Sequence, residues 1–235
     1  MIRIRFSGIG SGIVTMVVLF GLTPGVSGTH LGAQDTTTSS SGSDVTFTIE
    51  PYNLLPSAPV VIKDIEVDGQ EISPKTPIHL EGHWLGTVRV TVQNVSSKSV
   101  VYAGIIFLFP ETGNGTPAKP FYTTGTAIGR RPDIAFYRRD GTKVEPTSSQ
   151  ATATPVNIPP GGTAIISYAD NFNDQQSAAQ QAGGNLTMIN VSLPEVWFSD
   201  NTRWLDGNYL VPAGELGRWR FASADQFSRK AQVAQ

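Results

Sequence analysis

Short apolar runs separated by turn residues are the feature that most restricts the fold of this chain. Its 235 residues include 24 glycines and 16 prolines, many of which stand between runs rich in Val, Ile, Thr, Phe and Tyr. Such runs, bounded by Gly, Pro, Asn, Asp or Ser, predict β-strands joined by tight turns. Alternating strand and helix units are not visible, which argues against an α/β fold with a parallel sheet.

Two neighbouring runs carry the clearest strand patterns. Apolar and polar residues alternate in 87–95 (TVRVTVQNV), which predicts a strand with one buried face. Residues 100–109 (VVYAGIIFLF) are apolar on both faces, which predicts a central strand covered on both sides. We expect the two to pair as a hairpin through the polar turn between them. Asp68-Gly69 and Asp140-Gly141 predict further hairpins, because tight primed turns need positive φ.

The remaining strands are predicted at 45–50, 60–67, 70–72, 134–137, 142–145, 156–158, 163–168, 186–198, 209–211 and 218–221. Only 173–182 (NDQQSAAQQA), followed by Gly183-Gly184, predicts a helix. Together these elements predict an all-β fold, an antiparallel β-sandwich over 45–222 with one short helix, and the resemblance given below implies its Ig-like type. A Ser/Thr-rich leader over 29–44 is expected to be flexible, and a polar tail over 223–235 to form a short helix or a frayed end.

The first 28 residues have the layout of an export signal. Arg3 and Arg5 precede the apolar run IVTMVVLFGL, and small residues follow Pro24-Gly25. Val26-Ser27-Gly28 forms one cleavage box, and a later one ends at residue 33. The apolar run is shorter than the roughly 20 residues of a membrane-spanning helix, so we expect its removal and no stable membrane span afterwards. This predicts a bacterial protein exported to the periplasm or the exterior.

Composition excludes several classes of chemistry. The chain has no cysteine, which rules out disulfides, thiol nucleophiles and cysteine-bound metals. A net charge of −2 is unlike that of proteins that wrap nucleic acid. No nucleophile elbow and no phosphate-binding glycine loop occur in the predicted domain. We expect no nucleic-acid partner, no cofactor and no catalytic activity.

Three stretches resemble segments of exported bacterial Ig-like and fibronectin-III-like domains. NVSSKSVVYAGIIFLFP is similar to their Val-rich strand, polar turn and strand ending in Phe-Pro, and IPPGGTAIISY to a Pro-Gly corner before a strand. VWFSDNTRW, with LGRW after it, resembles the last strands of uncharacterised exported proteins that have Gly where this chain has Asn201. Asn tolerates left-handed φ, so the turn should be kept. The resemblance implies the sandwich fold and export, and no activity.

His79, Glu81 and His83 suggest a metal site. On a strand over 78–84 they would share one face, and two imidazoles with a carboxylate suit zinc or copper. Alternate residues are about 6.8 Å apart, so one ion would need a bend at Gly82 to reach all three. The alternative is an outward polar face over a core containing Trp84.

A basic cluster in the middle of the chain suggests a binding surface. With aromatic residues interleaved, its charges could hold an anionic polymer or a phosphate-bearing lipid surface. The alternative is a solvated hairpin whose charges protect a strand edge. The predicted members are Arg130, Arg131, Arg138, Arg139 and Lys143.

Three of the four tryptophans lie between residues 197 and 219. If exposed, Trp204 and its neighbours would form a sugar-stacking platform; if buried, they belong to the core of the sandwich. The sequence thus favours an exported non-catalytic module of the cell envelope or exterior, used for binding or structure. A carbohydrate- or anionic-polymer-binding domain and a metal-handling protein are the alternatives.

Overall fold

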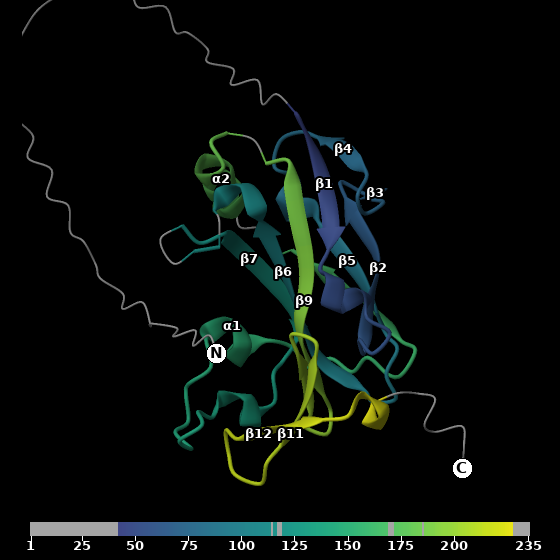
Figure 1. Cartoon of the computed structure of the whole chain (residues 1–235), viewed down its shortest axis with the longest axis vertical. Helices are drawn as coiled ribbons and strands as arrows, with labels where there is room; N and C mark the ends of the chain where they lie inside the picture. The colour runs from purple at the N-terminus through teal and green to yellow at the C-terminus, as the bar shows by residue number, and fades with distance from the viewer. Residues whose placement is uncertain (1–41, 114, 117–118, 169–171, 185, 228–235) are drawn as a thin grey trace, which may run out of the picture. The chain divides into compact units, whose positions relative to one another are not determined.

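A computed structural model describes residues 42–113, 115–116, 119–168, 172–184 and 186–227. This part of the chain is all-β, with an eight-stranded and a four-stranded sheet, here called the large and the small sheet (Figure 1). The large sheet contains β1 (Ser43–Ile49), β4 (Pro77–Leu80), β6 (Val100–Phe109), β7 (Tyr122–Gly129), β9 (Met188–Phe198), β10 (Arg203–Leu205), β11 (Asn208–Pro212) and β12 (Trp219–Ala222). The small sheet contains β2 (Val60–Val67), β3 (Gln70–Glu71), β5 (Arg89–Asn94) and β8 (Thr163–Ser167). Two α-helices, α1 (Ser148–Thr152) and α2 (Phe172–Gln181), accompany them.

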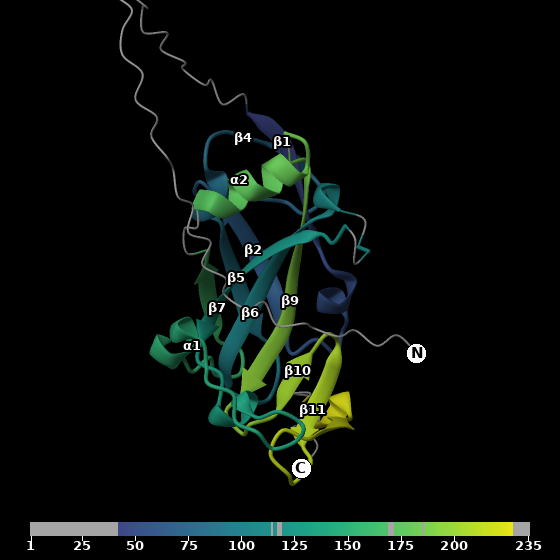
Figure 2. The ribbon, with the colours of Figure 1, turned by 90° about the vertical axis from the view of Figure 1, so that its left-hand side faces the viewer.

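The strand β9 organises the large sheet. One of its edges pairs antiparallel with β6, whose other edge pairs with β7. Its opposite edge is shared, because the first half pairs in parallel with β1 and the second half antiparallel with β10. The sheet therefore divides at β9 into an arm of β1 and β4 and an arm of β10, β11 and β12. In Figure 2 the second arm lies at the lower end and α2 at the upper end.

The core lies between the inner faces of the two sheets. Alternate residues of β5 point inward, as its period-two pattern predicts, and Val90 and Val92 are fully buried. Phe107 of β6 and Leu193 of β9 are equally buried from the opposite side. Strand β6 is central, as predicted, because it lies between β7 and β9. The chain has no cysteine, so this apolar packing stabilises the sandwich without disulfides.

The predicted hairpin between 87–95 and 100–109 is wrong. Strand β5 pairs with β2 and β8 in the small sheet, whereas β6 belongs to the large sheet. The chain crosses between the sheets at Asn94, whose buried amide donates to Lys98 O at 2.7 Å and Ile158 O at 2.8 Å. Its Oδ1 accepts from Ser96 N at 3.0 Å. These bonds satisfy the polar groups of a buried crossing between the two sheets.

Other predictions have mixed outcomes. The Asp68-Gly69 turn joins β2 to β3 with positive φ at both residues, as predicted. Helix α2 is confirmed, and Asn201 adopts a φ of 64° in the left-handed region. Residues 133–136 form a 3-10 helix instead of a strand, so the Asp140-Gly141 turn closes only a single bridge between Tyr137 and Lys143. The strands predicted at 142–145 and 156–158 are reduced to isolated bridges at Lys143 and Ile158. Strands β7 and β10 and helix α1 were not predicted, and β4 was expected only as part of the strand proposed for the metal site.

The ends of the predicted domain also differ from expectation. The predicted signal over 1–28 and all but the last residues of the leader lie outside the described residues, and β1 begins at Ser43. Phe227, placed by the sequence in a polar tail, is buried and stacks on Tyr209 with ring centroids 4.0 Å apart. The packed part of the chain therefore extends to residue 227, beyond the predicted boundary at 222. Within the described residues, no helix has the length and apolar character to cross a membrane.

Candidate functional site

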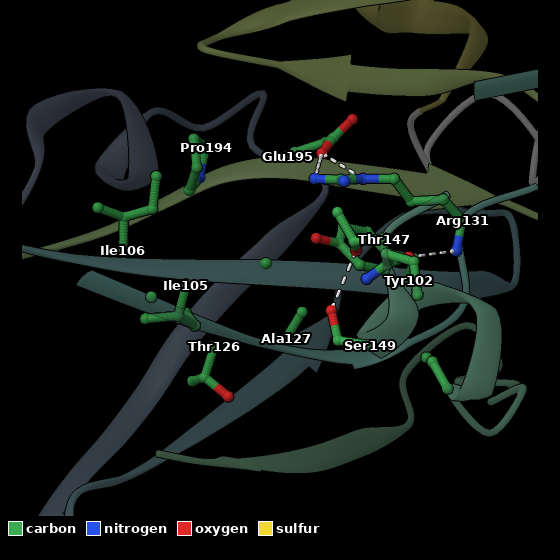
Figure 3. Close-up of a pocket in the computed structure, with 15 residues that line it drawn as sticks. Tyr102, Ile105, Ile106, Thr126, Ala127, Arg131, Thr147, Ser149, Pro194 and Glu195 are labelled. Atoms are coloured by element: carbon green, nitrogen blue, oxygen red, sulfur yellow. Dashed lines mark hydrogen bonds and ion pairs between the residues drawn. The ribbon is translucent and has the colours of Figure 1, made fainter. Parts of the chain in front are cut away.

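A pocket of about 450 Å³ opens on the outer face of the large sheet, turned away from the small sheet (Figure 3). Strands β6 and β7 form its floor, Glu195 of β9 stands at one side, and the segment 130–153 forms the wall that covers the sheet. We call this segment the covering segment. The volume falls in the range of small-molecule sites in proteins, about 300–1,000 Å³.

Residues with little or no side chain create the hollow. Gly104 of β6 pairs with Ala127 of β7, and Ile106 pairs with Gly125. Gly125 and Ala127 therefore occupy neighbouring positions on the outward face of β7. Gly129 continues this row. A Cβ atom at Gly125 would lie 2.7 Å from Ile105 O, so the close approach of the two strands itself requires glycine there.

An ion pair forms one wall. Nε of Arg131 donates to Glu195 Oε2 at 2.9 Å and its Nη2 donates to the same oxygen at 2.5 Å. The other carboxylate oxygen accepts from Trp197 Nε1 at 2.7 Å and lies 4.0 Å from Nη1 of Arg203. Only 13% of the Glu195 side chain is exposed, against 34% for Arg131, so the cation is the more accessible partner in the pocket.

Aromatic rings pack against both guanidinium groups. Arg131 lies over Tyr102 at 4.7 Å, and Arg203 lies over Trp219 at 4.3 Å. Trp197 contacts Trp219 edge to face at 5.3 Å. Delocalised cations on aromatic faces gain attraction while they lose water. The Arg131, Glu195 and Arg203 side chains with these three rings are called the outer cluster below.

Burial shifts the ionisation of groups in and beside the outer cluster. It lowers the pKa of Arg203, although the Glu195 charge opposes the shift. It raises the pKa of the Tyr102 hydroxyl, which Arg131 opposes. Burial also raises the pKa of Asp206, and the Glu195 charge adds to the rise. The outer cluster thus places two arginines around one carboxylate, with a second carboxyl group in its field.

The covering segment supplies the remaining polar groups. The backbone N–H of Arg131 donates to Gln150 Oε1 at 3.3 Å, which ties the base of Arg131 to helix α1. The hydroxyls of Thr147 and Ser149 lie 3.1 Å apart at the rim. In Figure 3, Arg131, Thr147 and Ser149 lie to the right of the floor residues Ile105, Ile106 and Thr126. The pocket therefore offers both hydrogen-bond donors and acceptors above a floor of small residues.

Of the predicted basic cluster, only Arg131 belongs to this site. Arg130 is half-exposed and pairs with Asp133 at 3.4 Å. Arg138, Arg139 and Lys143 are exposed around the Asp140-Gly141 turn, in the middle of the covering segment and outside the pocket. The sequence pattern thus joined residues that the fold separates into a pocket wall and a distant turn.

Trp204 cannot take part in sugar stacking. It is 1% exposed and belongs to the core, because β10 turns this side chain toward the small sheet. Trp84 and Trp197 are also buried, and Trp219 is partly covered by Arg203. Of the three tryptophans between 197 and 219, Trp204 lies in the core, whereas Trp197 is buried and Trp219 is half-buried in the outer cluster. The alternative of a buried position is therefore correct for Trp204, and the platform is not formed.

The predicted metal site is not formed. Strand β4 ends at Leu80, and Gly82 takes a φ of 64°, so residues 79, 81 and 83 do not share one strand face. His79 instead places Nδ1 at 3.0 Å from Asp44 and Nε2 at 3.6 Å from Glu81, with separate partners on its two nitrogens. Among the described residues, no group of three or more His, Cys, Asp or Glu side chains is arranged to hold a metal ion.

A second polar cluster fixes helix α2. Asp174 accepts hydrogen bonds from Tyr122 Oη at 2.8 Å, from Thr124 Oγ1 at 2.7 Å and from the hydroxyl of Tyr168. Burial and the bond to Asp174 raise the pKa of both tyrosines. These bonds join helix α2 to β7 and to the residue that follows β8. Because the polar groups of the cluster bond to one another, we assign the cluster a structural role.

The sequence contained a signal for the pocket that composition alone does not show. In YTTGTAIG, residues 122–129, small residues recur at Gly125, Ala127 and Gly129 with the period of a strand. Alternation of Gly and Ala on one face predicts a strand with a bare outward face. Glu195 carried no such signal, because only the register of β6 against β9 brings it beside Gly104.

Comparison of the chain with protein-family models, with curated proteins and with solved structures finds no match.

Proposed function

We propose that this protein is a non-catalytic binding module that holds a short neutral glycan in the pocket on the outer face of its large sheet. One observation carries the proposal: the exposed small residues Gly125 and Ala127 leave the floor open in front of a wall with both hydrogen-bond donors and acceptors. A flat ring can approach the floor closely, while its edge meets the polar wall.

The chemistry of the wall favours a neutral ligand. Arg131 and Glu195 already neutralise each other, so the pocket presents donors and acceptors without a strong net field. Sugar hydroxyls both donate and accept, and Arg131, Gln150, Thr147 and Ser149 supply partners of both kinds. A strongly anionic ligand would compete with Glu195 for Arg131 and bring a second negative charge close to it.

Export is the second part of the proposal. An Ig-like sandwich behind a signal at residues 1–28, or 1–33, suits a bacterial protein of the periplasm or exterior, where glycans are abundant. The two-sheet fold and the absence of cysteine are compatible with this type of domain. Mass spectrometry of the protein recovered outside the cytoplasm should show loss of 28 or 33 residues, whereas an intact N-terminus would contradict this part.

A pocket-filling substitution tests the binding function. Ala127→Phe places a ring over the floor, and we expect it to abolish saturation transfer to neutral oligosaccharides of glucose, mannose, galactose or N-acetylglucosamine in ligand-observed NMR. Thr123→Phe is the matched control, because Thr123 is exposed on the same face of β7 outside the pocket. Both sites are exposed, so neither change should unfold the protein.

Two results would overturn the proposal. One is the absence of transfer to every oligosaccharide of the panel with the wild-type protein. The other is equal loss of binding in Ala127→Phe and Thr123→Phe while both keep the wild-type far-ultraviolet circular dichroism.

Substitution of Gln150 by Ala should weaken binding about tenfold, because it removes one hydrogen-bonding group from the wall.

A further inference from the structure

Two segments that are distant in the sequence meet at the lower end of the sandwich as drawn in Figures 1 and 2. The turn at 138–143 lies against the loop between β11 and β12, so closely that a Cβ atom at Gly217 would overlap the carbonyl oxygen of Arg138. Gly217, with a φ of 76°, permits this contact. The contact brings the turn with Arg138, Arg139 and Lys143 against the loop with Leu216 and Arg218, and Phe221 follows this loop on β12. We call these six residues the end surface.

The end surface is basic in a chain of net charge −2. Arg218 pairs with Glu215 at 2.7 Å, but in the part of the chain that the structure describes no ion pair engages Arg138, Arg139 or Lys143. Asp140 and Glu145 are the acids on the turn itself, and hydrogen bonds from Thr142 together with the Arg138 charge lower the pKa of Asp140. Asp140 therefore offsets part of the Arg138 charge, while Arg139 and Lys143 add exposed positive charge that can meet a negatively charged partner.

The same surface exposes two large apolar side chains. Phe221, on the outer edge strand β12, is 75% exposed, and Leu216, at the tip of the β11–β12 loop, is 51% exposed. A soluble polyanion gains nothing from apolar side chains, whereas the boundary of a lipid bilayer accepts them beneath its headgroups. Basic residues beside exposed Phe and Leu are the combination that binds anionic membranes peripherally.

We propose that the end surface docks this protein on the anionic surface of a lipid bilayer. Arg138, Arg139 and Lys143 face the phosphate groups, and Phe221 and Leu216 enter the interface between them. The inference goes beyond the glycan pocket, because none of the six residues lines that pocket. It gives the module a second, independent attachment that would hold the pocket beside a membrane.

Vesicle flotation tests the docking surface with the full chain. The probes are vesicles of phosphatidylcholine alone and vesicles with one quarter phosphatidylglycerol, and binding to the neutral vesicles is subtracted. Each basic residue near an anionic surface contributes on the order of a tenfold rise in partitioning, so R138Q/R139Q/K143Q should reduce it by roughly 100-fold or more. L216S/F221S should reduce it by about tenfold. The control K63Q/K75Q/R89Q removes the same charge from exposed positions elsewhere and should bind like the wild type.

The competing partner is a soluble polyanion, represented by dextran sulfate. If R138Q/R139Q/K143Q loses dextran sulfate and vesicles equally while L216S/F221S binds vesicles like the wild type, the surface recognises charge alone and the membrane proposal is overturned. Equal losses in the control and the end-surface triple also overturn it, because they reduce the effect to net charge. Ala127→Phe should leave flotation unchanged, so failure of the glycan pocket and failure of the end surface are distinguishable.

Discussion

The two faces of the β6–β9 pair are both covered, but by different chemistry. On the inner face, Ile105, Phe107 and Leu193 meet the apolar side chains of the small sheet. On the outer face, Tyr102 and Glu195 lie beneath the covering segment with Arg131. Burial of apolar surface stabilises the inner face. Specific ion pairs and hydrogen bonds stabilise the outer face, and each of them is lost if one partner is removed.

This difference separates stability from specificity. Apolar packing has no preferred direction, so packing alone would give several positions of the covering segment similar free energies. The bonds from Arg131 to Glu195 and from Arg131 N–H to Gln150 are directional and admit one arrangement. We infer that the outer cluster sets the position of the pocket wall, while the inner core supplies most of the free energy of folding.

The largest expected effect lies on the inner face. Phe107 is fully buried and packs edge to face on Tyr168 at 5.5 Å. Phe107→Ala should lower the free energy of unfolding by about 3–5 kcal/mol, because it removes apolar contact and leaves a cavity. Urea denaturation would show a lower midpoint with an unchanged m-value. A loss below that expected for Glu195→Gln would break the comparison between the two faces.

An intermediate effect is expected on the outer face. Glu195→Gln places an amide against Arg131 and removes the charge that offsets Arg131 and Arg203. Breaking a fully buried ion pair costs about 3–5 kcal/mol, but solvent reaches Arg131, so we expect about 2 kcal/mol here. Urea denaturation measures this loss, and glycan binding should fall with it because the wall loses its position.

A triple substitution sharpens the same comparison. Glu195→Leu with Arg131→Met and Arg203→Met replaces the charges by apolar side chains of similar size. Buried ion clusters replaced in this way are often neutral or stabilising, so the triple variant should unfold within about 1 kcal/mol of the wild type. A triple variant less stable than Glu195→Gln would show that the charges themselves stabilise the fold.

Local pattern predicted the strands but not the sheets that they join. The alternation in 87–95 and the apolar run 100–109 correctly indicate β5 and β6. Their assignment to different sheets goes together with long-range contacts, such as the bond from the Asn94 amide to Ile158, 64 residues away in the sequence. A polar turn of this length fits a hairpin and a crossing equally well, and no local pattern contains these contacts.

The candidate site shows the same limit. Its floor has a local signal, the alternation of Gly125, Ala127 and Gly129, but its wall does not. Arg131 meets Glu195 only because the covering segment folds back across the sheet, and the two residues are 64 positions apart. The predicted basic cluster and Trp204 rested on residue type and proximity in sequence, which say little about which face of a strand a side chain occupies.

The smallest expected effect tests the field of the outer cluster. Burial and the Glu195 charge raise the pKa of Asp206 above its ordinary value of 3.8, so the folded state holds this proton more tightly than the unfolded chain. At pH 7 the ionised Asp206 therefore lowers the free energy of unfolding, and this loss disappears at low pH, where the carboxyl is protonated in both states. Asn does not titrate, so Asp206→Asn should be more stable than the wild type at pH 7, by about 0.3 kcal/mol since solvent screens this residue.

The pH dependence distinguishes the effect of the Glu195 charge on Asp206 from an effect of Asn on the turn at residues 206–207. Asp206 has a φ of 45° before Gly207, a conformation that Asn also tolerates, and a better turn residue would stabilise the variant equally at every pH. Urea denaturation from pH 7 down to pH 4 should instead show the advantage of Asp206→Asn fading as the wild-type carboxyl gains its proton. In a Glu195→Gln background the advantage at pH 7 should shrink, because the charge that adds to the shift is gone. If Asp206→Asn is more stable by the same amount at every pH and in both the wild-type and the Glu195→Gln background, the Glu195 charge does not affect Asp206.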